Sequence, residues 1–466
     1  MGRTILQNGT VITASDTFAA DVWLENGKVV ALAESGTKPG PDDTAIDAKG
    51  QYVIPGGIDC HTHMEMPFGG TFASDTFESG TIAAAHGGTT TIVDFAIQSK
   101  GSSMRAGLDA WHAKAEGRAA IDYGFHMIMT EANPATLAEM GDLVREGVTS
   151  FKMFMAYPGV FLVDDQQIFR AMQRAGELGA LVTMHAEIGL PIDVLVQQAI
   201  AAGHTAPVYH ALTRPEVAEA TGTERAIALA EMAGVPVYMV HLSAQRALER
   251  VMEARDRGLP AFAETCPQYL FLSENHLRGE PGNEWKGAGY VATPPLRPAH
   301  HHEHLWRGLR NYDLQVVATD HCPFCMKDQK ELGRNDFSKI PNGMPGVETR
   351  LHLLWEGVTQ KKISMNRFVE ITSTAPAKIF GMYGKKGTLA VGADADVVIW
   401  NPNKPKRLDK ANLHMKVDYS PFEGHTVPGS PSHVFSRGEL VVKDDQWVAA
   451  RAAGRGQFVR RSTFGL

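Results

Sequence analysis

The fold is decided by the stretch Val53-Ile54-Pro55-Gly56-Gly57-Ile58-Asp59-Cys60-His61-Thr62-His63-Met64. Before it, apolar and polar residues alternate around Asn8-Gly9 and Asn26-Gly27, dipeptides that supply positive φ in tight hairpin turns. After it, short apolar runs alternate with amphipathic segments, which is typical of parallel βα units. The stretch therefore separates a predicted antiparallel sheet from a predicted α/β unit, of which it is the first strand.

Eight apolar runs of this kind follow one another, and they cover residues 53–64, 89–96, 122–129, 149–156, 181–187, 235–243, 260–270 and 314–321. Helical segments with readable ends lie between most of them. Residues 168–178 form one such helix, with Asp164 and Asp165 as its cap and Gly179 at its end, and residues 244–257 form another, which follows Ser243. Eight strands with intervening helices have the size of a (β/α)₈ barrel, typically ~250 residues. We therefore predict an α/β protein with a TIM barrel.

An open doubly wound sheet is the competing architecture. It would normally carry a Gly-rich phosphate turn after its first strand, whereas this protein has His61-Thr62-His63 there. The strand pattern returns beyond Tyr383, in residues 387–389, 395–400, 433–436 and 439–442. We expect the two ends of the chain to pair in one small β domain of residues 1–54 plus 385–466, beside a catalytic barrel of residues 55–384.

Composition and charge limit the possible partners. The 466 residues are 44% hydrophobic and 21% charged, and the formal net charge of −7 is mild, so nothing indicates a nucleic-acid partner. No apolar run is long enough to span a bilayer, and the N-terminus turns polar before a signal-peptide region develops. Four cysteines predict no disulfide framework. We expect a cytoplasmic protein with a small neutral or weakly charged substrate and no membrane partner.

Candidate metal ligands stand at the ends of the predicted strands, where the active site of a parallel barrel lies. His61 and His63 are two residues apart in a strand and therefore point to the same face. His185, His241 and Asp320 each follow an apolar run. Four imidazoles and one carboxylate exceed what a single four-coordinate site needs, which favours two ions.

Lys152 is the candidate for the anion that two neighbouring cations need between them. It lies in the apolar run Phe151-Lys152-Met153-Phe154-Met155, where burial would lower the lysine pKa and leave a neutral amine. Such an amine can add carbon dioxide and become a carbamate whose two oxygens bridge the metals. A solvent-facing lysine and a Schiff-base lysine are the alternatives. The neighbouring histidines favour the carbamate.

Several motifs are spread over nearly the whole sequence: Gly56-Gly57-Ile58-Asp59-Cys60-His61-Thr62-His63, Gly87-Gly88-Thr89-Thr90-Thr91, Phe151-Lys152-Met153-Phe154, His185-Ala186-Glu187, Val240-His241-Leu242-Ser243, Thr319-Asp320-His321-Cys322-Pro323, Pro341-Asn342-Gly343 and Gly387-Thr388-Leu389-Ala390-Val391-Gly392-Ala393-Asp394-Ala395-Asp396. With them the protein resembles the dihydropyrimidinase and hydantoinase branch of the amidohydrolase superfamily. The resemblance implies a barrel flanked by a β-sandwich, a binuclear zinc site bridged by carbamylated lysine, and a homotetramer.

The resemblance also implies a division of the metal ligands. His61, His63 and Asp320 would hold the more buried ion, His185 and His241 the more exposed one, and Lys152 both.

The other implied site residues contact the substrate. Tyr157 matches the family's oxyanion tyrosine, and Thr293 and Asn342 match the residues whose backbone groups bind the ring amide. The sequence departs from the family in two places: Thr293 replaces the usual serine, and Ile188 stands where asparagine is common.

The implied reaction is attack of a metal-bridging hydroxide on the ring amide of 5,6-dihydropyrimidines (dihydrouracil, dihydrothymine), hydantoins, or both, giving N-carbamoyl amino acids. Asp320 would carry the proton to the departing nitrogen. Met66, Phe68, Phe154 and Phe161 are candidates for an apolar pocket around a ring substituent, although core packing explains each of them equally well.

Allantoinase and dihydroorotase are the nearest alternatives. Dihydroorotase is disfavoured because Met64-Glu65 follows His63, where an arginine would hold the substrate carboxylate and a glutamate would repel it. A scaffold protein that has lost its metal ligands is the alternative from another class, and this protein keeps all six.

Two further clusters are expected to do no chemistry. The tract His300-His301-His302-Glu303-His304 is expected on the solvated face of a helix. Arg451, Arg455, Arg460 and Arg461 are expected in a solvated or subunit-contacting arm.

Overall fold

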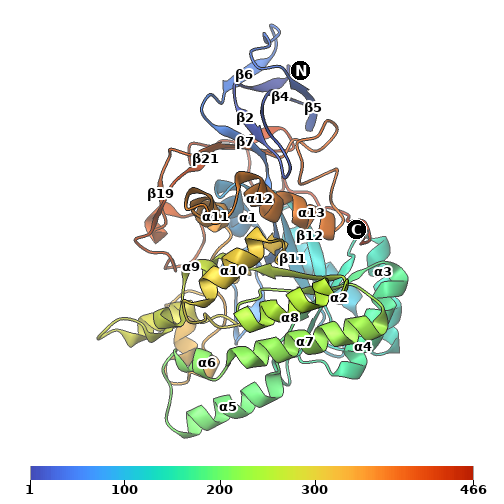
Figure 1. Cartoon of the computed structure of the whole chain (residues 1–466), viewed down its shortest axis with the longest axis vertical. Helices are drawn as coiled ribbons and strands as arrows, with labels where there is room; N and C mark the ends of the chain where they lie inside the picture. Colours follow the sequence, from blue (N-terminus) through green and yellow to red (C-terminus); the bar gives the residue numbers. More distant parts are fainter. Residues whose placement is uncertain (1, 465–466) are drawn as a thin grey trace.

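A computed structural model describes residues 2–464, and its largest sheet has eight parallel strands that curve into a nearly closed barrel (Figure 1). The strands are β8 (Gly57–Thr62), β11 (Thr89–Ile97), β12 (Asp122–Ile128), β13 (Ser150–Phe154), β14 (Leu181–His185), β15 (Val237–Met239), β16 (Ala261–Thr265) and β17 (Val316–Val317). Each pairs with the next in sequence order, and a parallel bridge between Thr62 and His321 joins the ends of the sheet. The predicted TIM barrel is confirmed.

The barrel strands are apolar runs because both of their faces are covered. Every residue of β8, β12, β13 and β14 is buried, as expected for parallel strands with helices outside. The helices between and after the barrel strands are α1 (Phe77–His86), α2 (Met104–Ala115), α3 (Pro134–Arg145), α4 (Asp165–Leu178), α5 (Gly189–Ala201), α6 (Tyr209–Leu212), α7 (Glu216–Ala233), α8 (Gln245–Asp256), α9 (Pro267–Phe271), α10 (His301–Arg310) and α11 (Arg350–Thr359). Within the described residues, no helix is both long and apolar enough to cross a membrane.

The run 53–64 forms two strands and not the single strand predicted. Its first part is β7 (Tyr52–Pro55), which pairs with β18 (Val397–Asn401) and β2 (Thr10–Ile12) in another sheet. Gly56 follows β7, and a Cβ there would overlap the Thr90 side chain. The backbone can pass closely over β11 at this point only because the residue is glycine.

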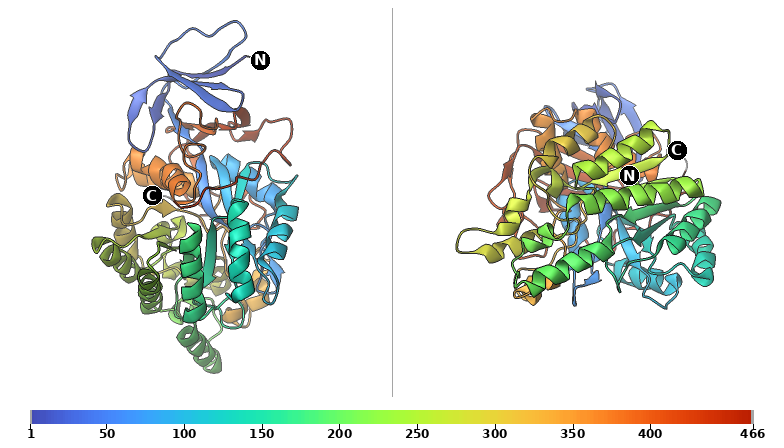
Figure 2. Two further views of the ribbon diagram at one scale, coloured as in Figure 1. Left: turned by 90° about the vertical axis from the view of Figure 1, so that its right-hand side faces the viewer. Right: turned by 60° about the horizontal axis from the view of Figure 1, so that its bottom comes forward.

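The two ends of the protein form a β-sandwich beside the barrel (Figure 2). One sheet has the order β23-β22-β21-β18-β7-β2-β3 and the other β5-β4-β1-β6. Their other strands are β1 (Thr4–Gln7), β3 (Thr17–Ala19), β4 (Asp21–Glu25), β5 (Lys28–Ala33), β6 (Thr44–Asp47), β21 (Ser430–Ser436), β22 (Glu439–Lys443) and β23 (Gln446–Trp447). Leu6 and Val22 of the smaller sheet pack in one buried cluster with Val11, Val53 and Val397 of the larger one.

The predicted ends of α4 are confirmed, but the predicted start of α8 is wrong. Asp164 accepts a hydrogen bond from the Gln167 backbone N–H, and Gly179 ends α4 with φ 65°. Ser243 does not cap α8, because its backbone N–H and its hydroxyl both donate to Glu219.

Two expectations of solvated side chains are wrong in part: His300, Arg451 and Arg460 are exposed as expected, but three other side chains of these clusters are buried. His301 is buried, and its Nδ1 accepts from the Gln245 N–H at the start of α8. In the C-terminal segment, Arg455 and Arg461 are buried against their own barrel, where Arg455 Nη1 donates to the Ala120 carbonyl at 3.0 Å and Arg461 Nη2 to Ser150 Oγ at 2.9 Å.

Candidate active site

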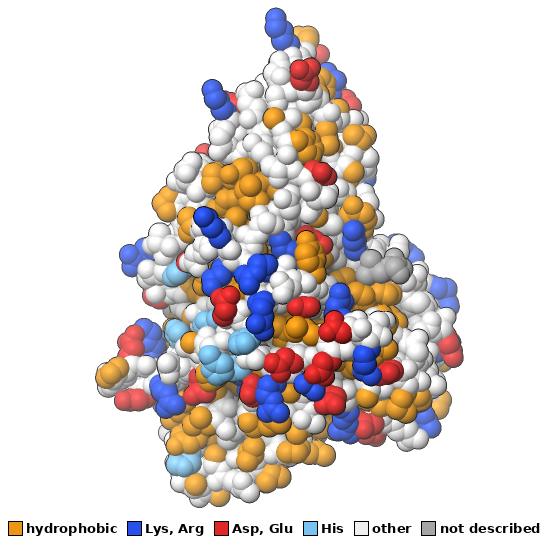
Figure 3. Space-filling view, in the orientation of Figure 1, with side chains coloured by type: hydrophobic (Ala, Val, Ile, Leu, Met, Phe, Trp, Pro, Cys, Tyr) orange, Lys and Arg blue, Asp and Glu red, His pale blue; other side chains and the backbone are white. Residues whose placement is uncertain are grey.

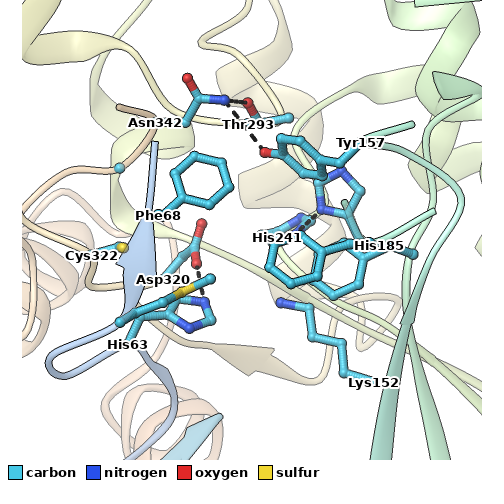
Figure 4. A pocket seen from close by; sticks show the side chains of 14 residues that line it. His63, Phe68, Lys152, Tyr157, His185, His241, Thr293, Asp320, Cys322 and Asn342 are labelled. Carbon is cyan, nitrogen blue, oxygen red and sulfur yellow. Dashed lines mark hydrogen bonds and ion pairs between the residues drawn. The ribbon is translucent and has the colours of Figure 1, made fainter. Parts of the chain in front are cut away.

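A narrow pocket opens at the carboxyl ends of the barrel strands, and most of the predicted site residues line it (Figure 4). These are His63, Lys152, Tyr157, His185, His241, Thr293, Asp320 and Asn342. His61 is fully buried, and its Nε2 lies 2.9 Å from the Lys152 Nζ. Strands and loops far apart in the sequence thus contribute to one site, because the parallel barrel directs all of its strand ends to one face.

Three of the candidate ligands converge on one point. The Nε2 atoms of His61 and His63 each lie 3.1 Å from Asp320 Oδ1. Ligand atoms of these three residues all lie within 4.8 Å of one another. Imidazole nitrogens and a carboxylate oxygen at this spacing fit a divalent ion.

His185 and His241 form a second point of convergence. His185 Nδ1 and His241 Nε2 lie 2.9 Å apart, and the His241 ring is 5.3 Å from that of His61. The other nitrogen of His185 bonds to Glu187 Oε2 at 2.9 Å, which leaves Nδ1 directed at His241. Two imidazole nitrogens that face each other in this way also fit a cation placed between them.

Lys152 lies between the two groups of histidines, and burial lowers its pKa to about 8. Its Nζ is 4.2 Å from the centroid of the Phe95 ring and 5.0 Å from that of Phe154. Because burial removes the ammonium from water, the neutral amine is favoured relative to a lysine in water, although the nearby carboxylates of Asp320 and Glu264 oppose this shift. A neutral amine is the form that reacts with carbon dioxide, so the residue fits the carbamate hypothesis.

Glu264, which the sequence reasoning missed, orients the buried histidine. It accepts a short hydrogen bond from His61 Nδ1, and others from the Tyr238 hydroxyl at 2.8 Å and the His241 backbone N–H at 3.1 Å. A carboxylate on one nitrogen of an imidazole fixes its tautomer and turns the other nitrogen toward a metal. The available signal was an acidic residue inside the apolar run 260–270, since a buried carboxylate needs polar partners.

Tyr157, Thr293 and Asn342 lie on the opposite side of the pocket from Lys152 (Figure 4). Asn342 Nδ2 donates to Thr293 Oγ1 at 2.9 Å and to the Tyr157 hydroxyl at 3.5 Å. Burial raises the pKa of Tyr157 to about 12, so the phenol keeps its proton and can donate a hydrogen bond. The group can therefore bind polar atoms of a small ligand that faces the histidines.

Aromatic side chains form the wall between the inner pocket and the solvent. Phe68 packs edge-on against Tyr157, with ring centroids 5.6 Å apart, and Phe161 stacks on Phe154 at 4.9 Å. The inner pocket has a free volume of about 40 Å³ and adjoins an outer cavity of about 860 Å³ that also contacts Phe68, Tyr157 and Phe161. An apolar substituent on a bound ring can thus extend outward along this wall.

Two other groups of histidine and acidic residues offer no comparable metal site. The rings of His86 and His414 stack at 3.5 Å with planes 14° apart, so their lone pairs lie in two separate, nearly parallel planes, which is a poor geometry for binding one ion together with Asp445. The other group is Asp122, Asp394 and Asp396, and Lys386 Nζ lies 2.6 to 3.0 Å from all three carboxylates.

Comparison with known proteins agrees with this arrangement. Residues 52–441 match the amidohydrolase family. The sequence is 58% identical over 464 residues to a D-hydantoinase of Streptomyces coelicolor, covering 99% of this protein and 98% of that one. A D-hydantoinase of Geobacillus stearothermophilus is 50% identical, with coverage of 99% and 97%. The crystal structure of dihydropyrimidinase from Brevibacillus agri NCHU1002 superimposes with a TM-score of 0.97 at 50% identity, covering both proteins completely.

Proposed function

Because this protein belongs to the amidohydrolase family, we propose that it is a metal-dependent hydrolase that opens the ring amide of hydantoins, 5,6-dihydropyrimidines, or both, to N-carbamoyl amino acids. The observation that carries the proposal is the convergence of four histidines and Asp320 around one buried lysine, in a pocket at the carboxyl ends of the barrel strands.

The proposed cofactors are two divalent ions, with Zn²⁺ as the first choice. His61, His63 and Asp320 would hold one ion, His185 and His241 the other, and carbamylated Lys152 both. The family generally binds divalent metals, and imidazole with carboxylate is a donor set that suits zinc. When bound, the ions would lower the pKa of a water molecule and polarise the amide carbonyl.

The protein groups around the pocket would bind and orient the ring. The Tyr157 hydroxyl would donate to the amide oxygen as negative charge develops there. Backbone groups of Thr293 and Asn342 would hold the remaining ring amide, and Asp320 would deliver a proton to the departing nitrogen. The aromatic wall of Phe68, Phe154 and Phe161 favours rings that carry an apolar substituent.

Dihydroorotase is not favoured, but the reason differs from the one expected from the sequence. Glu65 does not face the pocket, and its carboxylate instead accepts from the Phe77 N–H at the start of α1. It would therefore not repel a substrate carboxylate. What disfavours the reaction is that no arginine is among the residues that line the inner pocket, where it would bind that carboxylate.

We also propose that the protein is a homotetramer in the cytoplasm. The outer face of α5 exposes Leu190 (62%), Val194 (51%) and Leu195 (38%), and a contiguous apolar surface of this kind favours contact with another subunit. Figure 3 shows apolar side chains gathered at the lower end of the molecule, where α5 lies in Figure 1. The four cysteines are all free, which suits a reducing compartment.

A substrate panel tests the proposed reaction. The purified, metal-loaded protein should open dihydrouracil, hydantoin and 5-substituted hydantoins faster than allantoin or dihydroorotate. Turnover of dihydroorotate alone would contradict the proposal, and a folded, metal-free protein that opens none of these rings would favour the scaffold alternative.

A further inference from the structure

Lys330 is a fully buried lysine for which the proposed reaction has no use. It begins a short 3₁₀ helix (Lys330–Gly333) in the loop that follows β17. Its Nζ donates to the backbone carbonyl oxygens of Val291 at 3.1 Å, Pro341 at 2.7 Å and Gly343 at 2.8 Å. All three N–H groups of the ammonium are therefore used by the backbone.

The charge of Lys330 has no carboxylate partner within residues 2–464, in contrast to that of the buried Lys386. Burial lowers the pKa of Lys330 to about 7, whereas the three carbonyl dipoles favour the charged form. An apolar side chain would fill the same space without the cost of burying an ammonium. The N–H donors of Lys330, and not the size of its side chain, therefore explain why a lysine occupies this buried position.

The three carbonyls belong to the two segments that carry Thr293 and Asn342. These segments also bond to each other, since the Gly343 N–H donates to the Val291 carbonyl at 2.9 Å and the Asn342 side chain to Thr293 Oγ1. Lys330 therefore ties together the two segments that line one side of the catalytic pocket.

Asn342 stands between two residues whose carbonyls Lys330 binds. In a trans peptide the carbonyl and the following N–H point in opposite directions. The Pro341 carbonyl and the Asn342 N–H belong to one peptide group. Because the carbonyl points toward Lys330, the Asn342 N–H points away from Lys330. Among the hydrogen bonds of residues 2–464, none uses the backbone N–H of Asn342 or the backbone carbonyl of Thr293, so both groups are free to bind a ligand.

We propose that Lys330 is a positioning residue for substrate recognition: its ammonium fixes the backbone groups of Thr293 and Asn342 in the orientation that binds a ring amide. This inference rests on the proposed function, because ring-amide binding is its premise. Lys330 touches neither the substrate nor the metal ligands, and it acts only through the backbone of the two segments.

Steady-state kinetics of the metal-loaded enzyme test the inference with Lys330→Met, which keeps the length of the side chain and removes the donors. KM for dihydrouracil should rise at least about 10-fold while kcat changes less than about threefold. The reason is that the weakened contacts bind the substrate and the transition state equally, and the reacting groups stay in place. Metal content should equal that of the wild type. The control is Lys327→Met, which removes an exposed lysine of the same loop and should leave KM unchanged.

A second readout separates positioning from general loosening of the fold. Glutarimide differs from dihydrouracil by a methylene in place of the ring N–H remote from the bond that breaks. We express the preference for dihydrouracil over glutarimide as the ratio of their kcat/KM values. This ratio should be at least about fivefold lower in Lys330→Met than in the wild type, because the groups that recognise the ring N–H lose their orientation.

An unchanged KM and an unchanged preference in Lys330→Met would overturn the inference. If this variant does not fold, Lys330→Leu, a shorter apolar side chain that also lacks N–H donors, takes its place, and a wild-type KM there would overturn the inference equally. A wild-type enzyme that opens no cyclic amide would instead contradict the proposed function.

Discussion

At the scale of single residues, the site depends on polar side chains that the barrel buries. Lys152 and His61 are almost completely buried, and they face each other and the carboxylates of Glu264 and Asp320. Burial of so many ionisable groups is costly unless they pair or bind metal. The arrangement is therefore expected to depend on bound ions.

Replacement of Lys152 by alanine should remove at least one of the two ions, because it removes the anion that would bridge them. Metal content measured by mass spectrometry should fall from two ions per protomer to one or none, and ring opening should fall with it. The control is Lys378→Ala, which changes an exposed lysine far from the pocket. A Lys152→Ala protein with full metal content and activity would refute the carbamate.

Replacement of Tyr157 by phenylalanine should lower kcat roughly 10²-fold or more, as loss of an oxyanion donor does. Since burial raises the pKa of Tyr157 to about 12, the hydroxyl keeps its proton throughout the range in which the enzyme is folded and assayed. The alkaline side of the pH profile of kcat should accordingly be the same in both proteins. A profile whose alkaline limb disappears in Tyr157→Phe would show that the tyrosine ionises during turnover.

The sequence indicates which residues could bind metal, but it does not indicate what surrounds them. His61, His63 and Asp320 could be proposed because strand ends share one face of a barrel. The roles of Glu264 and Glu187 could not be proposed, since they depend on which ring nitrogen each carboxylate contacts, and that depends on side-chain positions in three dimensions. The individual roles of Tyr157, Thr293 and Asn342 remain predictions.

At the scale of elements, helix and strand types were predictable where one local signal decides them. Asp164 and Gly179 define α4 because capping geometry is local. The division of the run 53–64 between two sheets was not predictable, because apolar residues suit both sheets and the passage depends on the packing of Gly56 against Thr90. The start of α8 depends in the same way on a histidine from another helix.

His301 stabilises the start of α8 from α10, and its removal should measurably destabilise the protein. Burial lowers the pKa of His301 to about 4, so at neutral pH the ring is uncharged and Nδ1 accepts from the Gln245 N–H. His301→Ala should lower the free energy of unfolding by about 1 kcal/mol or more, the typical effect of losing a helix cap. Denaturant titration measures this, and His300→Ala, at the exposed neighbouring position, is the control. If His301→Ala and His300→Ala lowered the free energy of unfolding equally, the hydrogen bond from Gln245 to His301 would contribute nothing to stability.

At the scale of the whole molecule, segments that belong to the barrel and segments that belong to the terminal sheets alternate along the sequence. β7 and β8 are separated by one residue but belong to different sheets, and the segment near Phe458 returns to bridge Tyr123 of the barrel. The division into residues 1–54 plus 385–466 and residues 55–384 remains a prediction. The C-terminal contacts with the barrel suggest that neither part would be stable when expressed alone.

The proposed subunit contact on α5 should be sensitive to charge. Leu190→Asp combined with Val194→Asp places two carboxylates on one face of the helix, one turn apart. Light scattering should show a tetramer for the wild type and a smaller species for the double variant, whereas Met232→Asp, at an exposed apolar residue of α7, should leave the mass unchanged. A monomeric wild type would contradict the proposed assembly.

We propose that two ions, and not one, make this barrel a ring-opening hydrolase. The most direct measurement is a titration of the metal-free protein with Zn²⁺ in bicarbonate buffer, with hydantoin or dihydrouracil hydrolysis followed at each addition. Activity should rise until two equivalents per protomer have been added and then stay constant. Full activity at one equivalent, or in the absence of metal, would contradict the claim.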